Sequence, residues 1–134
     1  MSLEVVYEGK RRCETRFKDL AWFATDAPAR YGGREEEGSP TDLVAAALGS
    51  CILTVLSTLA EPQGINVNGA AATVRKEMTD GRPRRISRLT LDIRVPVTVT
   101  DAQRAAFEAG VHACPVKQSL HPDIEVVLNF RWGA

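Results

Sequence analysis

The feature that most constrains the fold of this chain is an uncharged, mostly apolar run at residues 43–60, which spans 18 positions. That length lies at the lower edge of a membrane-spanning helix, so length alone allows two interpretations. Small and polar residues such as Gly49, Ser50 and Thr54 dilute the run, and no basic flank orients it across a bilayer. We therefore expect a central buried helix and no membrane partner.

The residues before this run mark where the helix begins. Ser39 can cap the helix, Pro40 suits its first position, and Asp42 has the spacing of a capping box. Apolar residues then recur every four positions on two neighbouring stripes, so the helix is apolar around most of its girth. Such a helix is buried on nearly all sides. In a chain of 134 residues this predicts a second subunit, and hence a homodimer.

Alternation of apolar and polar residues predicts β-strands on both sides of this helix. The expected strands are residues 3–8, 12–17, 20–25, 70–78, 88–95 and 124–132, and a second helix is expected at 100–113. Residues 29–38 are rich in glycine and charge, which is typical of a surface loop. This order of elements predicts one α+β domain over residues 1–134, with a sheet packed on the long helix.

Composition excludes several classes of function. Lysine plus arginine equals aspartate plus glutamate, 17 against 17, so no long-range field attracts nucleic acid or an anionic membrane. Three cysteines and a first segment without an apolar core argue against secretion, and we expect reduced thiols in the cytoplasm. His112 and His121 lack the spacing of metal ligands with the cysteines, so we expect no metal. No motif for a nucleotide cofactor or a serine hydrolase is present.

Two cysteines stand in unusual settings. Cys51 lies within the apolar run, where burial alone would raise its pKa and leave it inert, so reactivity requires a nearby cation. Cys114 precedes Pro115 and can cap a short helical turn, whose free amides favour a thiolate. Both residues also allow a plain interpretation, as a packed thiol in a helix and a thiol in a chain reversal. Cys13 shares a strand face with Phe17, and we interpret it as a core residue.

These segments together resemble the OsmC/Ohr thiol peroxidases (osmotically inducible protein C and organic hydroperoxide resistance protein). The matching segments are SPTDLVAAALGSC at 39–51, CPV at 114–116 with SLHPDIEV at 119–126, and more weakly EGKRRCET at 8–15. The resemblance implies antiparallel sheets packed on a long central helix. It further implies an intertwined homodimer, with both active sites at the subunit interface.

The resemblance also implies roles for individual residues. Cys51 corresponds to the peroxidatic cysteine and Cys114 to the resolving one, and Arg12 is the best match to the family's arginine, with Arg11 as a near rival. Where the family's organic-hydroperoxide branch has a glutamate, this chain has Thr41. The neighbouring Asp42 either orients the arginine or simply caps the helix.

The function that follows is a two-step thiol peroxidase acting on organic hydroperoxides, and also on hydrogen peroxide if its pocket admits it. Cys51 would become a sulfenic acid, Cys114 would condense with it, and a small dithiol or a dithiol protein would reduce the resulting disulfide. Two alternatives remain open. One is a redox-sensing homodimer that binds a small hydrophobic ligand without turnover, and the other is a structural homodimer whose cysteines have no role.

Overall fold

The computed structural model describes residues 2–133 and has an α+β fold built of two three-stranded sheets and a long helix. Its helices and strands are β1 (Glu4–Gly9), β2 (Arg12–Phe17), β3 (Leu20–Thr25), α1 (Pro40–Ala60), β4 (Ala71–Met78), β5 (Ile86–Val95), α2 (Asp101–Gly110), α3 (Pro115–Ser119) and β6 (Glu125–Trp132). The chain divides into two compact units, residues 1–44 and 45–134, and each is described by itself. The expectation of a single domain stays a prediction.

The first unit is a meander in which β2 pairs antiparallel with both β1 and β3. Two-residue turns connect the strands, with Lys10–Arg11 in the first and Lys18–Asp19 in the second. All four residues have positive φ, between 51° and 69°, as a tight hairpin of this length demands. The register places Arg12 and Cys13 on opposite faces of β2, as the alternation predicts.

One face of this meander carries large apolar side chains that the described residues of the first unit leave exposed. Leu3 immediately precedes β1 and alternates with Val5 and Tyr7 on the strand, with 48%, 61% and 59% of their surface exposed. On β3, Leu20 and Trp22 are exposed to 72% and 61%. Monomers rarely leave so much apolar surface open to water.

Helix α1 begins where its capping residues predict. The Asp42 amide donates to Ser39 Oγ at 3.3 Å, and the Ser39 amide donates to the Asp42 carboxylate at 2.9 Å. This reciprocal pair satisfies two amides at the helix N-terminus, and Pro40 occupies the first helical position. Asp42 is therefore a capping residue.

Within one chain α1 is buried along one side, and its burial on the other sides by a second subunit stays a prediction. Its buried residues form one stripe, composed of Ala45, Leu48, Gly49, Ile52, Leu56 and Ala60. The other apolar residues of α1 are only half-buried or exposed, because one sheet covers only one side of a helix. The segment 40–63 also has the length and hydropathy of a membrane span, and about 33% of the tested window is buried.

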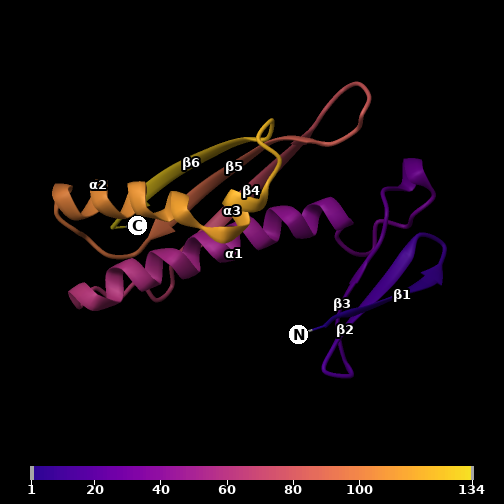
Figure 1. The fold of residues 1–134 in the computed structure, drawn as a ribbon, viewed down its shortest axis with the longest axis horizontal. Helices are drawn as coiled ribbons and strands as arrows, with labels where there is room; N and C mark the ends of the chain where they lie inside the picture. Colours follow the sequence, from indigo (N-terminus) through magenta and orange to yellow (C-terminus); the bar gives the residue numbers. More distant parts are fainter. Residues whose placement is uncertain (1, 134) are drawn as a thin grey trace. The chain divides into compact units, whose positions relative to one another are not determined.

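The second unit places its helices on one face of the sheet β4–β5–β6 (Figure 1). Strand β5 lies in the centre and buries Leu89, Leu91, Ile93 and Val95. It pairs antiparallel with β4 but parallel with β6. The parallel pair refines the expectation of antiparallel sheets: the chain reaches β6 through a crossover that contains α2 and α3, as a parallel connection requires.

Two glycines let α1 lie close to its neighbours. A Cβ at Gly49 would lie 3.1 Å from Val74 of β4, and a Cβ at Gly110 would lie 2.6 Å from Leu59. The middle of α1 is therefore held against the sheet, and its C-terminal end against α2. This packing fixes the part of α1 that carries Cys51.

Candidate active site

The structure brings Cys51 and Cys114 together although 63 positions separate them in sequence. Cys51 lies in the middle of α1 and is half-buried, whereas Cys114 immediately precedes α3 and is fully buried. Their side chains lie close enough to interact, and both thiols are free. Two neighbouring thiols are candidates to form a disulfide.

The local sequence explains the position of Cys114. Its backbone is extended, with φ −47° and ψ 123°, because a residue before proline is kept out of the helical region. Pro115 then begins α3, and Cys114 is its N-cap, as predicted. The Lys117 amide donates to Cys114 Sγ at 3.5 Å, and the Gln118 amide donates to the Cys114 carbonyl at 3.0 Å.

The electrostatic balance at Cys114 differs from the expectation that its helix start favours a thiolate. Burial is the largest influence and raises the pKa of the Cys114 thiol, and the hydrogen bond with Cys51 raises it further. The amides of Lys117 and Val116 lower the pKa, but by less. A helix of five residues offers few aligned amides, so desolvation prevails. Cys114 therefore rests as a neutral thiol.

Arg12 lies on β2 in the first unit and is held by two carboxylates. Its Nη2 lies 3.3 Å from Glu37 Oε1 and its Nε lies 3.6 Å from Glu8 Oε1. Because Cys51 belongs to the other unit, the predicted proximity of Arg12 to Cys51 stays a prediction. Arg11 is not on the strand at all: it lies in the turn with φ 69°, and its amide donates to the Tyr7 hydroxyl at 3.3 Å.

Sequence reasoning missed Glu37. It considered Thr41 and Asp42 as residues that orient the arginine or cap the helix; Asp42 caps α1, and Thr41 Oγ1 lies 3.1 Å from Ser39 Oγ. Glu37 lies in the loop before α1, where no periodic pattern indicates which way a side chain points. The available signal was only the acidic run at residues 35–37.

A second residue that sequence reasoning missed, Asp26, organises this loop. Its buried carboxylate accepts hydrogen bonds from the amides of Ala27 at 2.7 Å and of Arg34 and Glu36 at 3.3 Å. These amides, led by that of Ala27, lower the pKa of Asp26, and the charge of Arg12 adds to the effect. Asp26 therefore fixes the segment that leads into Glu37.

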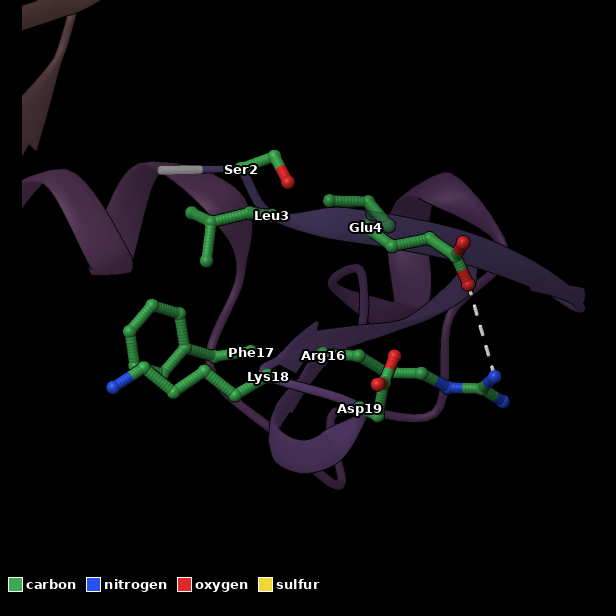
Figure 2. A pocket seen from close by; sticks show the side chains of 8 residues that line it. Ser2, Leu3, Glu4, Arg16, Phe17, Lys18 and Asp19 are labelled. Carbon is green, nitrogen blue, oxygen red and sulfur yellow. Dashed lines mark ion pairs between the residues drawn. The ribbon is translucent and has the colours of Figure 1, made fainter.

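One open hollow of about 850 Å³ lies beside the turn between β2 and β3. Figure 2 shows Leu3 and Phe17 on one side of it and the Arg16–Glu4 ion pair on the other, with nitrogen and oxygen 3.7 Å apart. No cysteine lines this hollow. Within residues 2–133, no group of three or more histidine, cysteine or acidic side chains is placed to hold a metal ion.

Comparison with known proteins supplies the remaining context. The family model described as OsmC-like protein matches residues 33–129. The search of curated proteins finds no match. A solved structure from Psychrobacter arcticus 273-4, described as that of a suspected osmotic stress induced and detoxification response protein, shares 32% identity with a TM-score of 0.92. The similarity covers 98% of this chain and 96% of that one.

Two more distant structures share the fold. The organic hydroperoxide resistance protein OhrB of Bacillus subtilis is 18% identical with a TM-score of 0.74, over 98% of each chain. An organic hydroperoxide resistance protein OsmC from Legionella pneumophila is 18% identical with a TM-score of 0.75, over 96% of this chain and 94% of that one.

Proposed function

The chain belongs to the OsmC-like protein family, and from this premise we propose that it is a thiol-dependent peroxidase that reduces organic hydroperoxides. Family membership supports a peroxide-related redox role. The observation that carries the finer proposal is the contact between the half-buried Cys51 thiol and the buried Cys114 thiol. Peroxide can reach the half-buried Cys51 thiol, and the buried Cys114 thiol lies beside it. This arrangement suits a peroxidatic and a resolving cysteine.

In the first step, the Cys51 thiolate attacks the outer oxygen of the hydroperoxide. The new S–O bond forms as the O–O bond breaks, and the leaving alkoxide takes a proton and departs as the alcohol. Cys51 becomes a sulfenic acid, oxidised by two electrons. A guanidinium stabilises both the thiolate and the departing oxyanion, and Arg12 is our candidate for it.

In the second step, Cys114 loses its proton and its thiolate attacks the Cys51 sulfur. The S–O bond breaks, and the expelled hydroxide takes a proton and leaves as water. The disulfide protects Cys51 from further oxidation, and an external dithiol returns both thiols by supplying two electrons. Cys114 rests as a neutral thiol, so it must lose its proton during this second step.

The guanidinium of Arg12 needs a carboxylate to hold it in one orientation. The family has a glutamate for this role at a position where this chain has Thr41. We propose that Glu37 supplies it instead, assisted by Glu8. Asp26 supports the arrangement indirectly, because it fixes the backbone of Arg34 and Glu36 just before Glu37. Glu37 is then a positioning residue and touches no reacting atom.

We further propose a cytoplasmic homodimer as the working form. Two surfaces support this assembly: the uncovered side of α1 and the apolar face of the β1–β3 meander. A second copy of the chain can cover both surfaces, whereas the single sheet of one small domain covers only one side of α1. An apolar subunit boundary near Cys51 would also favour alkyl hydroperoxides over hydrogen peroxide.

Turnover of tert-butyl hydroperoxide with dithiothreitol as the reductant tests the proposal. The unaltered protein should turn over, Cys51→Ser should fall to background, and the matched control Cys13→Ser should retain the full rate. Cys114→Ser should accumulate Cys51 sulfinic acid under excess peroxide, because the protective condensation is lost. Absence of turnover in the unaltered protein, or a disulfide that contains Cys13, would overturn the assignment.

A further inference from the structure

The outer face of the second sheet, opposite the helices, carries charged side chains in rows set by the strand register. In the row Glu77–Arg88–Glu125, the central arginine contacts both acids, at 3.3 Å and 2.9 Å. In the row Thr73–Asp92–Asn129, the carboxylate of Asp92 pairs with Arg75 and accepts a hydrogen bond from Asn129 at 3.0 Å. The first row pairs its own charges, and Asp92 in the second is paired by Arg75 of the neighbouring row, so the acids of both rows have an arginine partner.

The next row breaks this pattern. It consists of Ala71, Arg94 and Arg131, and the last two are register partners on the adjacent parallel strands β5 and β6. Arg94 Nη1 donates to the Thr73 hydroxyl at 3.1 Å. Within residues 2–133, neither Arg94 nor Arg131 lies in a salt bridge. Two positive charges thus face the same side with no acid in their row.

Like charges at partnered positions of a sheet destabilise it unless something between them carries the opposite charge. Neighbouring strands are about 4.8 Å apart, so two arginines on one face can converge on a single anion. The row borders a hollow of about 420 Å³ that Thr73, Asp92, Asn129 and both arginines help to line. Asp92 lines the same hollow: Arg75 and Asn129 contact its oxygens and lower its pKa, and the charge of Arg94 adds to this effect without a salt bridge.

We propose that this hollow is an anion site in which Arg94 and Arg131 grip a phosphate group, with the Asn129 amide and the Thr73 hydroxyl beside it. A planar guanidinium group can donate two parallel hydrogen bonds to two oxygens of a phosphate. This geometry favours phosphate over halide ions. Because strand alternation directs Arg94 away from the face that packs on α1, the site is separate from the two cysteines. Its ligand is a free phosphate or the phosphate group of a small metabolite.

The test is an NMR titration of the complete protein with inorganic phosphate at constant ionic strength, with sodium chloride as the balancing salt. Amide and guanidinium signals of Arg94 and Arg131 should shift and saturate, with a dissociation constant in roughly the millimolar range expected for a few charge-assisted hydrogen bonds. A parallel titration with glycerol 3-phosphate distinguishes the sources: tighter binding than inorganic phosphate indicates a metabolite, and equal binding indicates the free ion.

Arg131→Gln should weaken phosphate binding about tenfold, the loss expected for one charge-assisted pair. Arg131→Lys should recover only part of the lost affinity, because lysine keeps the positive charge but lacks the planar guanidinium that donates two parallel hydrogen bonds. Arg88→Gln, on the same face but in a balanced row, should leave binding unchanged. Shifts that grow linearly without saturation, or that persist unchanged in a folded Arg131→Gln protein, would overturn the proposal.

Discussion

Burial of Cys114 sets the pH dependence of the second chemical step. The raised pKa of this thiol leaves only a small thiolate fraction at neutral pH, and that fraction grows about tenfold for each pH unit below the pKa. We expect the rate of disulfide formation after one equivalent of peroxide to rise steeply between pH 6 and pH 8. Quenched-flow mass spectrometry that separates sulfenic acid from disulfide measures it. A flat profile would mean that Cys114 does not attack as the thiolate.

The same shift in pKa has a consequence for stability. Because the folded protein holds the Cys114 proton more tightly than the unfolded chain does, its contribution to the free energy of unfolding is complete at neutral pH. The contribution is lost as the pH rises above roughly 8.5, where an unfolded thiol ionises first. Urea unfolding of the reduced protein should therefore show a decline in this range, and Cys114→Ser should show a smaller one.

Arg12 should matter more to the reaction than to folding. Its partners Glu8 and Glu37 lie on the surface, and exposed ion pairs contribute at most about 1 kcal/mol. Arg12→Ala should slow stopped-flow oxidation of Cys51 well over tenfold, because the proposed guanidinium stabilises both the attacking thiolate and the departing oxyanion. Glu37→Gln should slow it less, because the guanidinium remains but is held more loosely.

Arg16→Ala is the matched control for Arg12, because Arg16 lies on the same face of β2 and also pairs with two acids, Glu4 and Glu14. It should leave the oxidation rate unchanged. If Arg16→Ala is instead the damaging variant, the activating guanidinium has been assigned to the wrong residue.

At the scale of elements, the turn between β2 and β3 contains strain that can be relieved. Lys18 and Asp19 have φ values of 51° and 63°, a region that costs a residue with a Cβ about 1–2 kcal/mol, less for aspartate. Asp19→Gly should therefore raise the free energy of unfolding by up to about 1 kcal/mol. Thermal unfolding should rank the variants at this position as glycine, then aspartate, then alanine. A more stable Asp19→Ala protein would contradict the turn geometry.

Elements with a local cause could be predicted from the sequence. Ser39 and Asp42 begin α1, Thr100 and Gln103 form a capping box at α2, and Pro115 places Cys114 at a helix start. Features with a non-local cause could not. The parallel pairing of β5 with β6, the Arg12–Glu37 ion pair and the burial that governs Cys114 all depend on segments that meet only after folding.

For the whole molecule, the decisive prediction concerns assembly. Light scattering at micromolar concentration should give twice the mass of one chain, because one sheet covers only one side of α1.

Ala47 is exposed on this helix in the single chain, so the dimer would bury it. Ala47→Arg should therefore weaken the dimer, since a buried charge without a partner is costly. Ala102, which is also exposed but lies on the more polar helix α2, provides the control: Ala102→Arg should stay dimeric. A monomer without detergent would contradict the dimer, and a protein that needs detergent would mean that lipid covers α1 instead.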